Sequence, residues 1–317
     1  MKANLYASAV TVTPDAVEIV ATDFYGRLYR WDRRHETPLS PPVTLTQRTI
    51  WGMVLTPDGR EAVTACSDGT VGRWDRASGQ SLSTPIPAHG GPALAVARTR
   101  DGGEIVSASQ DGTVRRWERS TGASLAEPLR GHTGSVQAVA VTPDDEEIVS
   151  GGVDGTVRRW NRTSGAPVGA PLLGHSGPVQ VLAAGSTGRR FVSGGRDGTV
   201  RRWDRDLGRQ AGGPLVTGSP VRSLVLTGDG EITAGCADGT VHRWDAGGQP
   251  VGPVLPAHYD VVWAMATTPD ETELVTAGWD TIVLRWERIT GVPLRPARTD
   301  TRIEPVPRLE LHGSTPF

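Results

Sequence analysis

Histidine, serine and aspartate recur together along this chain, and these residue types can form a nucleophile, its general base and the acid that orients the base. One such set is His132, Ser150 and Asp154. A catalytic site needs the set once, in one cleft, whereas here it returns from repeat to repeat. We therefore predict a structural role, in which these polar groups satisfy one another inside the fold. No catalytic residue is predicted, and the chain is expected not to be an enzyme.

Histidines are also common metal ligands, but four of them are spaced by about 43 residues or a multiple of it: His89, His132, His175 and His258. This spacing places them on separate structural units and not around one ion. The two cysteines do not form a pair with zinc-ligand spacing, and no glycine-rich phosphate loop opens a helix. We predict no metal and no cofactor.

The units that carry these residues are marked by the dipeptide Arg-Trp, which occurs seven times with gaps of 41 to 43 residues between successive tryptophans: Trp31, Trp74, Trp117, Trp160, Trp203, Trp244 and Trp286. In the fourth unit, Val136–Val141 alternates at period two and predicts a strand. A turn with Pro143 leads to a second strand from Glu147, and Asp154-Gly155 predicts a hairpin to a third strand ending at Trp160. Residues 167–173 are expected to form a short outer strand.

These repeats resemble those of the WD-repeat β-propeller family, whose period is about 40 to 45 residues. The matching motifs are Gly131-His132, Val153-Asp154-Gly155 and Trp160-Asn161, and Trp-Asp itself occurs at Trp31, Trp74, Trp203 and Trp244. The resemblance covers about residues 1–297. It implies an all-β fold: a seven-bladed β-propeller with four antiparallel strands per blade. Residues 298–317 are expected to be a C-terminal tail, either an added edge strand or without fixed structure.

The resemblance also implies a hydrogen-bonded chain of His, Ser or Thr, Asp and Trp that ties the loops of a blade to its strands. The chain is complete in repeats 3, 4, 5 and 7: His89, Ser107, Asp111 and Trp117; His132, Ser150, Asp154 and Trp160; His175, Ser193, Asp197 and Trp203; His258, Thr276, Asp280 and Trp286. Repeats 1, 2 and 6 lack the histidine, and repeat 1 has Tyr25 at the aspartate position. We therefore expect blades 3, 4, 5 and 7 to be the stiffest.

An arginine precedes every repeat tryptophan, at a position where the family usually has an aliphatic residue. Six repeats have a glutamate seven residues before the turn position, at the start of the antiparallel neighbouring strand, and repeat 5 has Arg190 instead. We predict an Arg–Glu pair in each of these six blades. The alternative is that all seven arginine head groups are solvated.

Three tryptophans do not belong to the repeat, namely Trp51, Trp263 and Trp279. In the WD-repeat family, three positions per repeat face the partner-binding rim, and the resemblance places all three tryptophans there. Aromatic residues and arginine are enriched at binding hot spots. The alternative is that these tryptophans plug the channel or pack between blades. The predicted partner-binding residues, on blades 7, 1 and 2 and on blades 5 and 6, are Tyr6, Phe24, Trp51, Trp263, Trp279, Arg196 and Arg222.

The net charge of −2 gives no overall preference for nucleic acid or an anionic membrane. No apolar run approaches the ~18 residues of a membrane helix, and the N-terminus lacks a signal-peptide pattern. Cys66 and Cys236 lie in repeats 2 and 6, which are not adjacent in a seven-bladed ring, so we expect no disulfide. All but one of the 33 basic residues are arginine, which is typical of GC-rich bacterial genomes. We expect a soluble, cytoplasmic protein.

The predicted function is a non-catalytic interaction scaffold, monomeric in isolation, that binds a protein or peptide on the rim. Two alternatives remain open. An enzyme or small-molecule sensor could use the mouth of the axial channel, where only Arg196 and Arg222 supply charge. A permanent structural subunit of a larger complex would keep the aromatic residues covered at all times.

Overall fold

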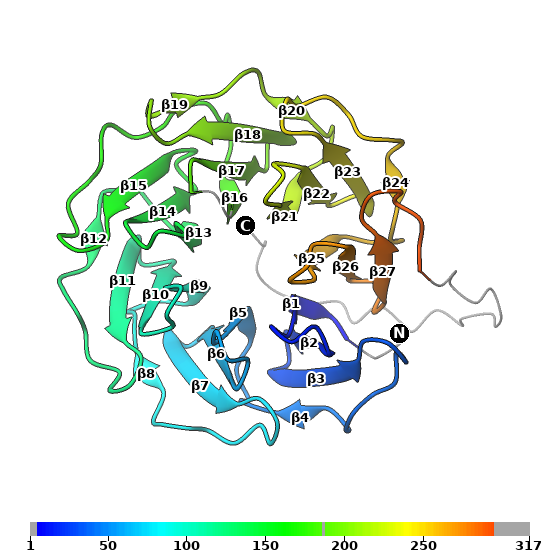
Figure 1. The fold of residues 1–317 in the computed structure, drawn as a ribbon. Coiled ribbons are helices and arrows are strands. Elements are labelled where there is room, and N and C mark those ends of the chain that lie inside the picture. The colour runs from blue at the N-terminus through cyan, green and yellow to red at the C-terminus, as the bar shows by residue number, and fades with distance from the viewer. Residues whose placement is uncertain (1–4, 186–187, 295–317) are drawn as a thin grey trace, which may run out of the picture.

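The computed structural model describes residues 5–185 and 188–294, and the described chain forms a closed ring of seven β-sheets (Figure 1). The innermost strands, in blade order, are β1 (Ala7–Val12), β5 (Ile50–Leu55), β9 (Ala93–Arg98), β13 (Val136–Val141), β16 (Val179–Ala184), β21 (Val221–Leu226) and β25 (Val262–Thr267). The second strands are β2 (Glu18–Asp23), β6 (Glu61–Cys66), β10 (Glu104–Ser109), β14 (Glu147–Gly152), β17 (Arg190–Gly195), β22 (Ile232–Cys236) and β26 (Glu273–Gly278). The all-β, seven-bladed fold expected from the repeats is confirmed.

The third strands carry the repeat tryptophans: β3 (Arg27–Asp32), β7 (Thr70–Asp75), β11 (Thr113–Glu118), β15 (Val157–Asn161), β18 (Thr199–Asp204), β23 (Thr240–Trp244) and β27 (Val283–Glu287). The outer strands are two residues long: β4 (Val43–Thr44), β8 (Ile86–Pro87), β12 (Leu129–Arg130), β20 (Leu215–Val216) and β24 (Leu255–Pro256), with β19 (Arg209–Gln210) as an extra piece in blade 5. Within each blade, successive strands pair antiparallel, except that β19 and β20 of blade 5 both pair with β18.

Blade 4 departs from the expected four strands. The segment 167–173 makes two isolated bridges, Trp160 with Pro167 and Val157 with Leu172, and no outer strand. In blade 7, Trp286 bridges Pro293, and the rest of the expected outer strand, like the tail 298–317, lies outside the described residues.

The core lies between blades. Each apolar cluster joins the third-strand tryptophan of one blade to the preceding blade; Trp117 of blade 3, for example, packs in one cluster with Val63 and Val71 of blade 2. The seven repeat tryptophans are all buried, with Trp203 only 1% exposed. This burial accounts for the fixed period, because every blade must present the same large apolar side chain to its neighbour.

The ring closes where blade 1 meets blade 7. Leu5 and Ile19 of blade 1 share a core cluster with Val275 and Ala277 of blade 7. The four strands of blade 1 come from one continuous segment, and no strand in the described part of the chain crosses this seam. Within the described residues, the ring therefore closes by packing and without a shared strand.

Strand direction gives the ring two different faces. The turns between second and third strands, and the starts of the innermost strands, lie at one end of the sheets, which we call the hairpin face. The turns between first and second strands, and the ends of the third strands, lie at the other end, which we call the belt face. The predicted rim residues belong to the hairpin face, whereas the Arg–Glu pairs belong to the belt face.

Candidate functional site

One residue at the start of every innermost strand lies in a β-bulge. The register shifts between Ile50 and Gly52 in blade 2, and between Val262 and Ala264 in blade 7, so Trp51 and Trp263 are the bulged residues. A bulge bends the strand and re-aims the side chain it carries. The seven bulge residues on the hairpin face are Ser8, Trp51, Leu94, Gln137, Gln180, Arg222 and Trp263.

Four predicted rim residues form one aromatic cluster, namely Phe24, Trp51, Trp263 and Trp279. Phe24, in the β2–β3 turn, meets all three tryptophans edge to face, with ring centroids 5.2 Å from Trp263, 5.3 Å from Trp51 and 5.9 Å from Trp279. The rings of Trp263 and Trp279 stack at 4.8 Å. The structure thus brings together residues from blades 1, 2 and 7, which are up to 255 positions apart in the chain (24 to 279).

All four cluster residues are half-buried, so each keeps part of its ring exposed to solvent. The indole N–H groups of Trp51 and Trp279 are buried without a hydrogen-bond partner among the described residues. Buried donors without a partner are uncommon in folded proteins, because the lost hydration is not replaced. The cluster therefore combines apolar surface with two donors that no described group satisfies.

The remaining predicted rim residues are less tightly grouped. The guanidinium of Arg222 lies over the ring of Trp263 at 5.2 Å, in cation–π geometry. Burial and the charge of Arg196 lower the pKa of Arg222, while Arg196 itself is exposed. Tyr6 has its ring contact with Tyr25, at 6.1 Å, and is 42% exposed. Tyr6 and Arg196 thus flank the aromatic cluster without a ring contact to it among the described residues.

In blade 1, the hairpin between the second and third strands is held by Asp23, which the spacing of the repeats did not predict. Asp23, two positions before Tyr25, accepts hydrogen bonds from the backbone N–H groups of Tyr25 and Arg27, each at 2.9 Å. It also accepts one from the hydroxyl of Tyr29 at 3.0 Å. Asp23 is fully buried. In the sequence, the aspartate at the end of the second strand could have indicated this role. Its hydrogen bonds hold the turn that carries Phe24.

The four expected hydrogen-bonded chains are present. In blade 4, His132 bonds to Ser150 at 2.9 Å and to Asp154 at 3.1 Å, and Trp160 donates to the Ser150 hydroxyl at 2.9 Å. The same contacts are found in blades 3, 5 and 7, with Thr276 in place of serine in blade 7. Burial lowers the pKa of His89, His132 and His175, which favours the neutral imidazole. These groups are engaged with one another, which fits a structural role.

The predicted Arg–Glu pairs are confirmed in six blades, and each glutamate has a second arginine partner that the sequence analysis did not predict. Glu104 pairs with Arg116 of its own blade at 2.6 Å and with Arg162 of the next blade at 2.6 Å. The other five sets are Glu18 with Arg30 and Arg76, Glu61 with Arg73 and Arg119, Glu147 with Arg159 and Arg205, Glu231 with Arg243 and Arg288, and Glu273 with Arg285 and Arg33. We call these six Arg–Glu–Arg sets the belt. In the sequence, these second partners could have been recognised from the arginine that stands two positions after six of the seven repeat tryptophans.

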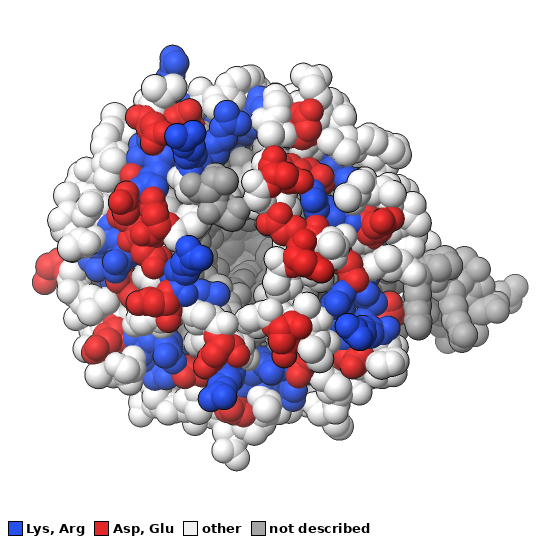
Figure 2. Space-filling view, in the orientation of Figure 1, with Lys and Arg blue, Asp and Glu red and all other residues white. Residues whose placement is uncertain are grey.

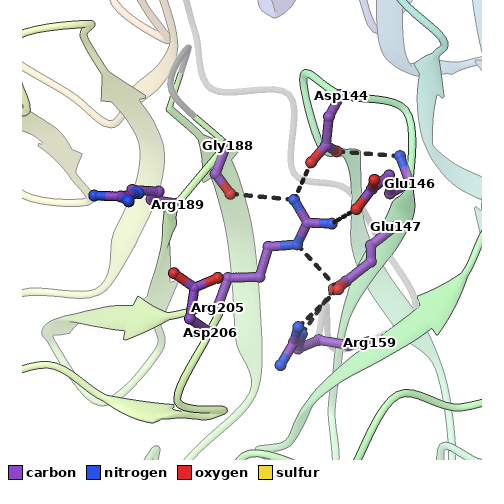
Figure 3. A pocket seen from close by; sticks show the side chains of 8 residues that line it. All are labelled: Asp144, Glu146, Glu147, Arg159, Gly188, Arg189, Arg205 and Asp206. Carbon is purple, nitrogen blue, oxygen red and sulfur yellow. Dashed lines mark hydrogen bonds and ion pairs between the residues drawn. The ribbon is translucent and has the colours of Figure 1, made fainter.

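Four of the in-blade belt arginines are buried and not solvated, with Arg116 6% and Arg243 5% exposed, whereas the bridging arginines Arg119 and Arg162 are half-buried. Beside one belt set, a groove of about 520 Å³ opens between blades 4 and 5. Figure 3 shows Arg205 reaching into this groove, where it pairs with Asp144, Glu146 and Glu147. Asp144, Glu146 and Glu147 therefore already bind a guanidinium in this groove.

Charges of both signs lie side by side around the central opening on the face seen in Figure 2. Within residues 5–185 and 188–294, no group of three or more His, Cys, Asp or Glu side chains is placed to hold a metal ion. The same part of the chain contains no helix long and apolar enough to cross a membrane. Cys66 and Cys236 are free and buried.

The repeat structure also agrees with a comparison against known families. Five segments match the model described as "WD domain, G-beta repeat", at residues 40–75, 79–118, 123–161, 167–204 and 249–287, and together they cover more than half of the chain. The chain belongs to the WD40 repeat family. The matched segments end in blades 2, 3, 4, 5 and 7 of the WD40 propeller, and the unmatched blades 1 and 6 are two of the three that lack the loop histidine. A direct comparison with curated proteins gave no match.

Proposed function

We propose that this WD40 propeller is a non-catalytic interaction platform that binds a protein or peptide segment at the rim of its hairpin face. WD40 propellers generally bind proteins or peptides, and this coarser assignment follows from the family. The observation that carries the finer proposal is the aromatic cluster, in which three tryptophans outside the repeat pattern meet around Phe24.

The chemistry of the cluster favours a segment with an apolar side chain and exposed backbone. Half-buried aromatic rings supply apolar contact area at low entropic cost, because each ring is already held by its neighbours. The indole N–H groups of Trp51 and Trp279 are buried and without a partner among the described residues, so they would donate to backbone carbonyls of a bound segment only after the rings shift on binding. Arg222 and Arg196 place positive charge beside the cluster, which favours a segment that also carries an acidic residue.

Selection from a random peptide library displayed on phage tests this proposal. We expect peptides enriched on the wild-type chain to lose at least tenfold in affinity for a variant carrying Trp51→Ala, Trp263→Ala and Trp279→Ala. A matched control carries Leu94→Ala, Gln137→Ala and Gln180→Ala, which changes the bulge residues of blades 3, 4 and 5 instead. Thermal unfolding of both variants verifies that the ring is intact. Equal binding to the wild type and the tryptophan variant would refute the proposal.

A further inference from the structure

The belt is interrupted at one junction of the described ring, between blades 5 and 6. Blade 5 has Arg190 where the other six blades have the belt glutamate, and blade 6 has Ala246 where the others have the bridging arginine. Both replacements affect the same junction. In the other junctions, the arginine at the position of Ala246 binds the glutamate at the position of Arg190, as Arg162 binds Glu104. The junction therefore keeps the in-blade arginine, Arg202, and has no belt carboxylate.

Two guanidinium groups converge at this junction. Nη1 of Arg190 and Nη1 of Arg202 both donate to the carbonyl oxygen of Ala246, at 3.3 Å and 3.4 Å. Both distances are long for a charged donor, and neither arginine forms an ion pair with a described residue. Burial lowers the pKa of Arg202, and the positive charge of Arg190 lowers it further, while the charge of Asp245 acts in the opposite direction.

The space around Arg202 is shaped by two glycines in left-handed conformation, Gly212 (φ 78°) and Gly248 (φ 88°). A Cβ atom at Gly212 would lie 2.6 Å from Nη2 of Arg202, and one at Gly248 would lie 2.5 Å from Nη1. The guanidinium thus packs against bare backbone. Its Nε is buried and has no hydrogen-bond partner among the described residues, whereas Nε of Arg116 or Arg159 bonds to the belt glutamate.

The six intact junctions show what chemistry such a place accepts, since in each of them one carboxylate lies between two guanidinium groups. We propose that the junction of blades 5 and 6 binds a carboxylate side chain from an acidic segment of a partner protein, seated between Arg190 and Arg202. The incoming carboxylate would restore the Arg–carboxylate–Arg arrangement of the rest of the belt. Arg190 is exposed, so the site is open to a segment arriving from solvent.

This site lies on the belt face, at the opposite end of the sheets from the aromatic cluster, and its chemistry is charged and not apolar. A partner bound here leaves the hairpin face free. The proposal is therefore independent of the function proposed above, and a failure of either leaves the other standing.

The test uses fluorescein-labelled hexaglutamate as the probe and hexaglutamine as its neutral counterpart, followed by fluorescence anisotropy at low salt. We expect Arg190→Glu to weaken hexaglutamate binding at least tenfold. The same substitution should raise the urea midpoint of unfolding, because it installs the Arg–Glu pair that six blades already have. A matched control is Arg60→Glu, which makes the same charge change at an exposed arginine of blade 2 on the belt face.

Three outcomes would overturn the proposal. The first is hexaglutamate affinity for Arg190→Glu within twofold of the wild type. The second is an equal loss for Arg60→Glu, which would assign binding to net charge alone. The third is displacement of the probe by inorganic phosphate at concentrations similar to those of glutamate peptide, which would indicate a general anion site and not one selective for a carboxylate segment.

Discussion

A single bulge residue per blade determines what the mouth of the channel presents. Ser8, Leu94 and Gln137 occupy this position in blades 1, 3 and 4 without forming an aromatic contact, whereas Trp51 and Trp263 occupy it in blades 2 and 7. Residues of very different size and polarity thus occupy the same bulge, and Trp263 also packs against the core cluster shared by blades 1 and 7. The bulge positions are separate from the third-strand tryptophans that pack between blades.

The two cysteines should be unreactive in the folded protein. Cys66 is 2% exposed and Cys236 is fully buried, and burial raises the pKa of the Cys236 thiol to about 12. Thiolate is the reactive form of cysteine, so we expect no labelling of the folded protein by Ellman's reagent at pH 8. Both thiols should be labelled after unfolding in about 6 M guanidinium. Ala126→Cys, at an exposed position, is the control and should react at once. Labelling of the native wild type at a comparable rate would contradict the buried placement.

Stability should fall as the pH drops from 7 to 5. Burial lowers the pKa of His89, His132 and His175 in the folded state, so the unfolded chain takes up protons first, near its ordinary histidine pKa of about 6.5. Unfolding free energy is then highest above this pH and decreases below it, by at most about 1.4 kcal/mol per pH unit for each histidine. Urea titrations at several pH values measure the slope.

The matched variant for this experiment is His132→Gln, which removes one of the histidines whose pKa is lowered by burial. It should lower the slope between pH 7 and 5 relative to the wild type, whatever its effect on stability at pH 7. A wild-type unfolding free energy that does not change over this range would contradict the pKa assignment.

At the scale of the strand pair, the belt adds charge pairing to the apolar packing at six of the seven junctions between blades. Within a blade, the glutamate at the start of the second strand and the arginine near the end of the third are twelve positions apart and face each other across a hairpin. The second arginine comes from the following blade, as Arg162 does for Glu104. Each belt glutamate is therefore shared between two sheets.

Removing one belt carboxylate should destabilise the ring. Glu104→Gln leaves Arg116 and Arg162 without a counter-charge at a site where both Glu104 and Arg116 have side chains only 7% exposed. Breaking one partner of a buried ion pair usually costs about 3–5 kcal/mol, and we expect a loss near 3 kcal/mol in urea unfolding. Glu127→Gln, at an exposed outer position, is the control and should change stability by less than about 0.5 kcal/mol. A similar small effect for both variants would show that the belt contributes little.

The elements could be predicted because their determinants are local. Val136–Val141 has the bounds that its alternation indicated, and the Arg–Glu pairs followed from positions on one hairpin. The second belt arginine could not be predicted in the same way, because its partner lies 58 positions away and depends on how closely blades approach. Asp23 was missed because the turn anchor of blade 1 is shifted by two residues relative to the other repeats. The aromatic rim positions were expected, but the contact of Phe24 with all three tryptophans depends on side-chain directions that the bulges set.

At the scale of the whole molecule, the two faces of the ring are chemically distinct. The hairpin face carries the aromatic cluster, and the belt face carries the Arg–Glu–Arg sets with one interrupted junction. The seven sheets keep these faces apart by the length of a six-residue strand. A rigid ring of this kind can hold two partners at once without contact between them.

The seam between blades 1 and 7 should be the first junction to open by fluctuation. The other junctions are bridged by a continuous chain segment, whereas among the described residues this one has no such segment and is held by packing and by ion pairs that include Arg33–Glu273 and Arg285–Glu36. We expect the amides of β1 to exchange with deuterium faster than those of β9, its counterpart in blade 3. Hydrogen exchange followed by mass spectrometry measures both peptides in one sample. Equal protection of β1 and β9 would show that the seam is as stable as the covalent junctions.

The position of the seam also determines how the ring would respond to tension. The first and last described blades of the chain are neighbours, so a pull applied through the two ends of the chain acts directly across the surface where β1 packs against blade 7 (Figure 1). No described strand spans that surface, so backbone hydrogen bonds between strands do not carry the load there. The propeller would open at this surface into a linear row of blades before any single blade unravels. When force is applied through the two ends of the chain, the ring should therefore open at a lower force than is needed to unfold a blade.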